Sequence, residues 1–188
     1  MKKSTVLLGT ALIVVCVAIA LSQVPARAAG PLDACSLLTK AEAEALLNQA
    51  SSSQKAGKVS APAGNQCAYF FKKKGGTYSA KVKVSSSEEI KSEGIFKSAR
   101  DVFDRQKRAR MANADTAQKM RSLGGLGDEA FWNGYDLWIV KGGYLLTILV
   151  QDQLAGSFKS REAMDKARAE QDFNLSQRAA SVILLKIK

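Results

Sequence analysis

The 188-residue sequence contains no histidine, and this absence excludes a large class of catalytic sites. Ser-His-Asp and Cys-His catalysis need an imidazole to accept a proton, and imidazole is also a common zinc ligand. The three cysteines are too few for a four-thiolate zinc site. We therefore expect no catalytic residue, no metal, no cofactor and no enzyme activity, and we keep an unrecognised enzyme as the last alternative.

A nucleotide-binding motif is present only in a relaxed form and in the wrong context. Gly125-x-Gly127-x-x-Ala130 matches a loose dinucleotide fingerprint. That motif normally follows a strand and begins a helix, so that the helix N-terminus binds the pyrophosphate. Here Phe131 and Trp132 follow in a segment that is typical of a strand. We therefore interpret these glycines as a tight turn.

The first 28 residues have the features of a secretory signal peptide. A basic start, Lys2-Lys3, precedes an almost unbroken apolar run over 5–21, and Ala26-x-Ala28 satisfies the small-residue rule of signal peptidase. We expect cleavage after Ala28, which leaves residues 29–188 as one domain in the periplasm or outside the cell. The alternative is an uncleaved membrane anchor, for which the apolar run is short.

Cleavage there would leave an even pair of cysteines, Cys35 and Cys67. In an oxidising compartment such a pair predicts one disulfide bond. The alternative is a redox or catalytic thiol. The sequence has no Cys-x-x-Cys motif and no histidine to activate a thiolate, so we favour the structural disulfide.

Sequence patterns after the signal predict an α+β fold in which a helix followed by a β-meander occurs twice. Alternation over Tyr78–Val84 predicts a half-buried strand, and Asn133-Gly134 and Gly142-Gly143 are two-residue hairpin turns. We predict one antiparallel sheet of five or six strands, with the helices on one face. The expected helices cover 39–49, 87–110 and 160–187; Thr39–Glu42 and Ser86–Glu89 form capping boxes at the start of the first two, and the last is expected to break near 172–174. The expected strands cover 66–72, 78–84, 129–132, 135–141 and 144–151. Residues 50–65 are expected to form a loop, with a short strand around Val59 as an alternative.

The strongest electrostatic feature is the basic side of the helix predicted around 97–110. The chain carries 28 Lys and Arg against 17 Asp and Glu, and such an excess attracts anions. We predict that this helix recognises an anionic envelope polymer, a lipid surface or a partner protein, since no specific nucleic-acid motif accompanies the charge. The alternative is a solvated face whose Asp101–Arg105 and Asp104–Arg108 pairs lie four residues apart. The candidate anion-binding residues are Lys97, Arg100, Arg105, Lys107 and Arg108.

A second candidate site is an aromatic groove on the later meander. Trp132, Tyr135 and Trp138 lie close together in the sequence, and aromatic side chains commonly line small-ligand grooves. A small-ligand-binding module is therefore our alternative function. The competing interpretation is that these side chains belong to the core, as strand aromatics in small domains usually do.

The opening of the expected mature chain resembles a known group of proteins. Asp33-Ala-Cys-Ser-Leu-Leu-Thr39 is followed by Cys67-Ala-Tyr69 and by Gly125-Leu-Gly-Asp-Glu-Ala130. These motifs resemble small secreted bacterial proteins of uncharacterised families, which are often lipoproteins. The resemblance spans most of 31–151 and implies a Cys35–Cys67 disulfide and an extracytoplasmic location, but it carries over no catalytic residue. The chain departs from the lipoprotein members because it lacks an acylated cysteine.

Overall fold

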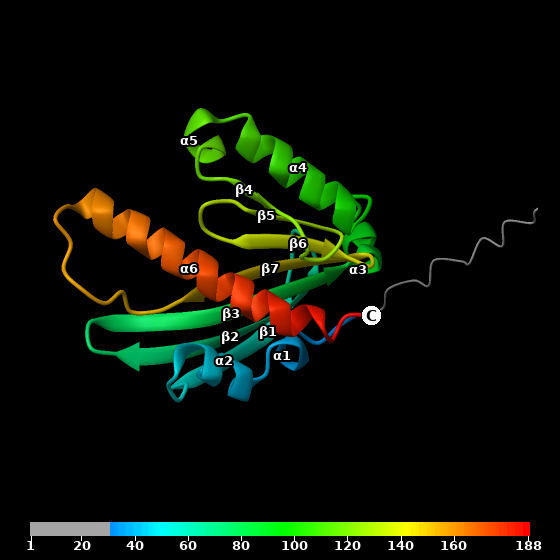
Figure 1. The fold of residues 1–188 in the computed structure, drawn as a ribbon. Helices are drawn as coiled ribbons and strands as arrows, with labels where there is room; N and C mark the ends of the chain where they lie inside the picture. The colour runs from blue at the N-terminus through cyan, green and yellow to red at the C-terminus, as the bar shows by residue number, and fades with distance from the viewer. Residues whose placement is uncertain (1–30) are drawn as a thin grey trace, which may run out of the picture.

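The computed structural model describes residues 31–188, so the expected signal peptide and its cleavage site lie outside the described residues. Seven strands form one antiparallel sheet in the order β1-β2-β3-β7-β6-β5-β4 (Figure 1). The strands are β1 (Ser53–Val59), β2 (Gly64–Lys73), β3 (Gly76–Ser86), β4 (Arg121–Leu123), β5 (Glu129–Trp132), β6 (Leu137–Lys141) and β7 (Tyr144–Gln151). The helices are α1 (Ala34–Leu37), α2 (Lys40–Leu47), α3 (Ser87–Ser92), α4 (Ala99–Met111), α5 (Ala114–Ala117) and α6 (Arg161–Leu184). None of these helices is long and apolar enough to cross a membrane.

The sheet consists of two meanders that meet at β3 and β7. Strands β1 to β3 form the first meander and β4 to β7 form the second, each by successive antiparallel pairing. The register of the junction pairs Val82 with Ile148 and Lys81 with Leu149. The predicted α+β class and antiparallel sheet are confirmed. The sheet has seven strands rather than five or six.

Helices cover both faces of the sheet, and not one face as expected. Phe131 and Trp132 are neighbours on β5 and therefore point to opposite faces. Trp132 packs edge-on against Phe173 of α6, with ring centroids 5.5 Å apart. Phe131 packs edge-on against Phe103 of α4, at 4.9 Å. We call the side of α6 the first face and the side of α4 the second face.

The first face carries the larger core. Helices α1, α2 and α6 pack there against alternate residues of the strands, including Tyr69, Val82, Ile148 and Trp132. In Figure 1, α6 lies in front of the sheet and crosses it. At its end, Lys186 Nζ lies 3.1 Å from the carbonyl oxygen of Ser36 and 2.7 Å from a carboxylate oxygen of Glu42, which joins the two ends of the fold.

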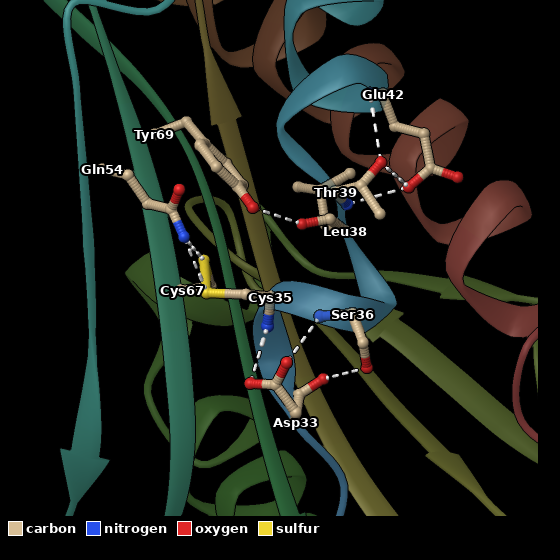
Figure 2. Close-up of a disulfide and its surroundings, with 9 residues drawn as sticks. All are labelled: Asp33, Cys35, Ser36, Leu38, Thr39, Glu42, Gln54, Cys67 and Tyr69. Carbon is tan, nitrogen blue, oxygen red and sulfur yellow. Dashed lines mark hydrogen bonds between the residues drawn. A yellow bond between two sulfur atoms is a disulfide. The ribbon is translucent and has the colours of Figure 1, made fainter.

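A disulfide between Cys35 and Cys67 fastens α1 to β2, with Cα atoms 5.1 Å apart (Figure 2). The backbone amides of Cys35 and Ser36 donate to the carboxylate of Asp33, which begins α1. Tyr69, two residues after Cys67 on the same face of β2, donates its hydroxyl to the carbonyl of Leu38 at 2.8 Å. Because Tyr69 is fully buried, this bond satisfies the only polar atom of its side chain.

The expected helix over 87–110 is two helices. Ser86 and Glu89 form a capping box that begins α3, and Gly94, with φ of 75°, lies just beyond its end. Ser98 then begins α4 by accepting a hydrogen bond from the amide of Asp101. The turn between the helices allows α4 to lie back across the second face.

The expected break in the last helix is absent, and a predicted loop contains a strand. Helix α6 is continuous from Arg161 to Leu184 because Asp172 and Phe173 are buried against the sheet, and this packing outweighs their modest helix propensity. Residues 53–59, expected in a loop with at most a short strand around Val59, form the edge strand β1, which is almost wholly exposed.

Replacing both cysteines by alanine should lower the free energy of unfolding by about 3–4 kcal/mol, because the disulfide closes a loop with a sequence separation of 32 residues. Urea denaturation followed by far-UV circular dichroism measures this loss. A reductant should weaken the wild type by a similar amount and leave the variant unchanged. Equal stability of the oxidised wild type and the variant would contradict the assignment.

Candidate functional site

The strand register places a row of side chains across the second face. Lys55 of β1 is paired with Ala68 of β2, Ala68 with Lys81 of β3, and Lys81 with Leu149 of β7. Asp136, the residue before β6, lines the same hollow as Lys81 and Leu149. The row therefore begins with a lysine at the sheet edge and ends at a carboxyl group beside Leu149.

A second row lies next to the first, two residues along each strand. Gln66 is paired with Lys83, Lys83 with Thr147, and Thr147 with Trp138 of β6. Trp138 lies parallel to Phe131, with ring centroids 6.0 Å apart, and both belong to the core under α3 and α4. This row thus passes from a covered region at β6 to an uncovered region at β2 and β3.

We call the uncovered region the open face. It is the second face of β1, β2 and β3 together with the adjoining side of β7. Its floor is apolar and its cations are lysines whose side chains are exposed, except that of Lys83, which is half-buried. The open face is defined by the lysines Lys55, Lys72, Lys81 and Lys83 and by the floor residues Ala68, Phe70 and Leu149.

Every charged residue on the strands of the open face is a lysine, and the carboxyl group of Asp136 lies at the margin of its hollow. Strands β1, β2, β3 and β7 contain no aspartate or glutamate. Within residues 31–188, no salt bridge involves Lys55, Lys72, Lys81 or Lys83. Side chains two residues apart on a strand share a face about 7 Å apart, so Lys81 and Lys83 repel one another. An anion placed between them would relieve this repulsion.

The centre of the open face is a hollow of about 200 Å³, lined by Lys81, Lys83, Asp136 and Leu149 among others. Burial lowers the pKa of Lys83, and the nearby carboxylate of Glu93 opposes this shift. Burial raises the pKa of Asp136 to about 6, although the positive charges of Arg110 and Lys81 oppose the rise. The hollow therefore has two lysine side chains on one side and, near neutral pH, a carboxylate at its margin.

The five predicted cations of the basic helix lie mainly on α4, and three of them are paired with carboxylates. Arg100 contacts Asp104 at 2.9 Å and Glu129, and Lys107 contacts Glu129 at 2.6 Å. Arg105 contacts Asp101 at 2.9 Å, which confirms that i,i+4 pair. The other expected pair does not form, because Asp104 turns to Arg100. Among the described residues, Lys97 and Arg108 have no salt bridge.

The predicted aromatic groove is not assembled. Trp132 is only 2% exposed and faces α6, whereas Trp138 lies on the opposite face under α4. Tyr135, in the turn between β5 and β6, is 56% exposed and lines the hollow of the open face. The three side chains therefore do not line one surface.

A second hollow, of about 700 Å³, lies between the start of α6 and the segment from α5 to β4. Trp132 and Gly134 line it together with side chains of both charges, including Lys166 and Asp165. Arg121, also in its lining, contacts Glu170 at 2.6 Å and lies over the ring of Phe173. The lining of this second hollow thus carries both charges, and one of its cations, Arg121, is already paired with Glu170.

The open face was not predicted, although one sequence signal points to it. Residues 45–87 contain no aspartate or glutamate while they contain several lysines. The alternation of Lys81 and Lys83 with apolar residues predicted a solvated side for that strand. Only the position of α4, which covers β6 and β7 but not β2, shows that this side is an uncovered sheet face.

Comparisons with known proteins add no assignment for this site. No protein family matches the chain, and no match is found among curated proteins or among solved structures. Within residues 31–188, no three Cys, Asp or Glu side chains are grouped so that they could hold a metal ion. The resemblance to small secreted bacterial proteins stays a prediction.

Replacing Asp136 by asparagine should stabilise the protein near neutral pH by about 1–2 kcal/mol. The folded state holds the proton of Asp136 up to a pKa of about 6, against an ordinary value of 3.8. The stability that Asp136 contributes therefore falls as pH rises between these two values, and this contribution is lost above a pH of about 6. Asparagine cannot ionise and avoids the loss.

Urea denaturation across that pH range tests this expectation, with Asp165→Asn as the control because Asp165 is an exposed residue of α6. The control removes the same charge from a solvated position and should retain the pH dependence of the wild type. An Asp136→Asn variant with unchanged pH dependence would contradict the assignment.

Proposed function

We propose that this protein is a secreted or periplasmic binding module without enzyme activity, which recognises an anionic envelope component or an acidic partner protein through the open face. The observation that carries the proposal is the set of lysines on three adjacent strands with no carboxylate on those strands. Surfaces of one charge raise the local concentration of oppositely charged partners and steer their approach.

The open face supports this function better than the basic helix does. Glu129 of β5 pairs with both Arg100 and Lys107, so these cations attach α4 to the sheet. An external anion would have to displace a carboxylate that is already in place. At Lys81 and Lys83, no salt bridge has to be broken before an anion binds.

The disulfide supports the proposed location. Disulfides persist in oxidising compartments and are rare in the reducing cytoplasm. The Cys35–Cys67 bond joins α1 to a central part of the fold, so it belongs to the structural class. A catalytic thiol would instead need an activated, accessible sulfur, and Cys67 is fully buried.

A second candidate function is the binding of a small molecule in the second hollow. Its volume of about 700 Å³ lies within the usual range of ligand sites, and Trp132 lines it. Because Lys166 and Asp165 both line it, a zwitterion is the favoured class of ligand. Tryptophan fluorescence of the wild type during titration with free amino acids tests this candidate, and an unchanged spectrum would exclude it for those ligands.

The main proposal predicts that anion binding depends on the open face. The Lys81→Gln/Lys83→Gln variant should bind polyglutamate and phosphatidylglycerol vesicles about tenfold more weakly than the wild type at low ionic strength, because two charge contacts are lost. Added salt should weaken wild-type binding. Fluorescence anisotropy and vesicle co-sedimentation measure these affinities.

The matched control is Lys97→Gln/Arg108→Gln, which removes the same charge from the segment of α4. These residues are the two predicted helix cations without a salt bridge in the described chain, and the control should bind within about twofold of the wild type. A loss of affinity confined to this control would place the site on the helix and refute the open face. Absence of wild-type binding to both probes would refute the proposal.

A further inference from the structure

The layer of helices on the second face is incomplete by the width of one helix. An α-helix with its side chains is about 10 Å wide, and neighbouring strands are about 4.8 Å apart, so one helix covers about two strands. Helix α4 packs on β6 and β7. On the first face, α6 packs on β6 and β7 while α1 packs on β2 and β3. The second face has no counterpart of α1 in the described chain, apart from α3 at the end of β3.

The uncovered strip has an apolar floor. Ala68 is 8% exposed and Leu149 is 5% exposed. Phe70 lies two residues after Ala68 on β2, and therefore on the same face, and it is half-buried. Ala68 and Phe70 form a short apolar column along β2, and Leu149 lies on the far side of Lys81. Lys55 of β1 lies on one side of this column, and Lys81 and Lys83 of β3 lie on the other.

We infer that the open face binds an acidic amphipathic helix of a partner protein, with apolar side chains on the floor and carboxylates against the lysines. This inference rests on the proposed function and names its partner. Residues at i, i+3, i+4 and i+7 of a helix form one apolar stripe. Flanking glutamates or aspartates would then reach the long lysine side chains on both sides of the stripe. The sequence of this partner is therefore expected to be rich in acidic residues.

Other occupants fit the open face less well. Strands β2 and β3 are paired on both edges, so an added peptide strand would find no free backbone groups there. A bilayer would need apolar side chains that protrude, whereas Leu149 and Ala68 lie below the lysines in a hollow. An anionic polysaccharide would use the lysines but would leave the apolar floor uncovered.

A designed peptide pair tests the inference. One peptide carries leucines at i, i+3, i+4 and i+7 with glutamates elsewhere; the other has the same composition in scrambled order, so that it has equal charge and no apolar stripe. The wild type should bind the amphipathic peptide about tenfold more tightly than the scrambled one. Phosphatidylglycerol vesicles serve as the lipid probe. Calorimetric titration measures the affinities.

Two variants separate the contributions of floor and charge. Phe70→Ser should abolish the preference for the amphipathic peptide and leave binding of the scrambled peptide unchanged. Lys81→Gln/Lys83→Gln should weaken binding of both peptides. Circular dichroism melting establishes that each variant is folded. Amide chemical-shift mapping on the wild type needs no variant, and the largest shifts should fall on β2 and β3.

The outcomes distinguish failure of the helix partner from failure of the proposed anion-binding function. Equal affinity for the two peptides, tighter binding to vesicles, or peptide-induced shifts confined to α4 would overturn the helix partner. In the first two cases, binding that weakens in the Lys81→Gln/Lys83→Gln variant would still support the proposed anion-binding function. Failure of the wild type to bind either peptide or the vesicles would overturn both.

Discussion

The pairing of β3 with β7 is the interaction on which the rest of the structure depends. Each meander is built from neighbouring segments of the chain, but this junction pairs residues that are 58 to 72 positions apart into one sheet. Its register brings Lys81 beside Leu149 and, through β6, close to Asp136. A slip of one residue would reverse the faces of every side chain in one half. It would bury the lysines of β3 and expose Val82 and Val84.

Local chemistry explains why much of the fold could be predicted. The Thr39–Glu42 and Ser86–Glu89 capping boxes and the glycine turns are encoded within a few residues, and the structure contains both capping boxes and hairpins at the predicted turns. The disulfide followed from two cysteines and their expected compartment. The sequence suggested strand β1 only around Val59, because its other side chains are polar and exposed and only the hydrogen bonds of β2 make it a strand. The continuity of α6 at Asp172 likewise depends on packing against distant strands.

The candidate site was harder to predict because charged residues that are close in the sequence need not form one charged surface in the folded protein. The basic helix looked like an anion-binding surface because its cations lie close together along the chain. Glu129 lies on β5 and neutralises part of that helix from a different element. By contrast, the lysines of the open face are spread from Lys55 to Lys83 and come together only when three strands pair. Sequence proximity therefore overstated one cluster and concealed the other.

The disulfide also changes what happens if the polypeptide is cut. Cys35 and Cys67 close a covalent ring that contains α2 and the exposed edge strand β1. Proteases attack exposed, accessible backbone, and part of the exposed backbone lies inside the ring. A single nick between the two cysteines releases no fragment, since both new ends stay linked through sulfur. An exposed part of the fold is thus one that a single cleavage cannot detach.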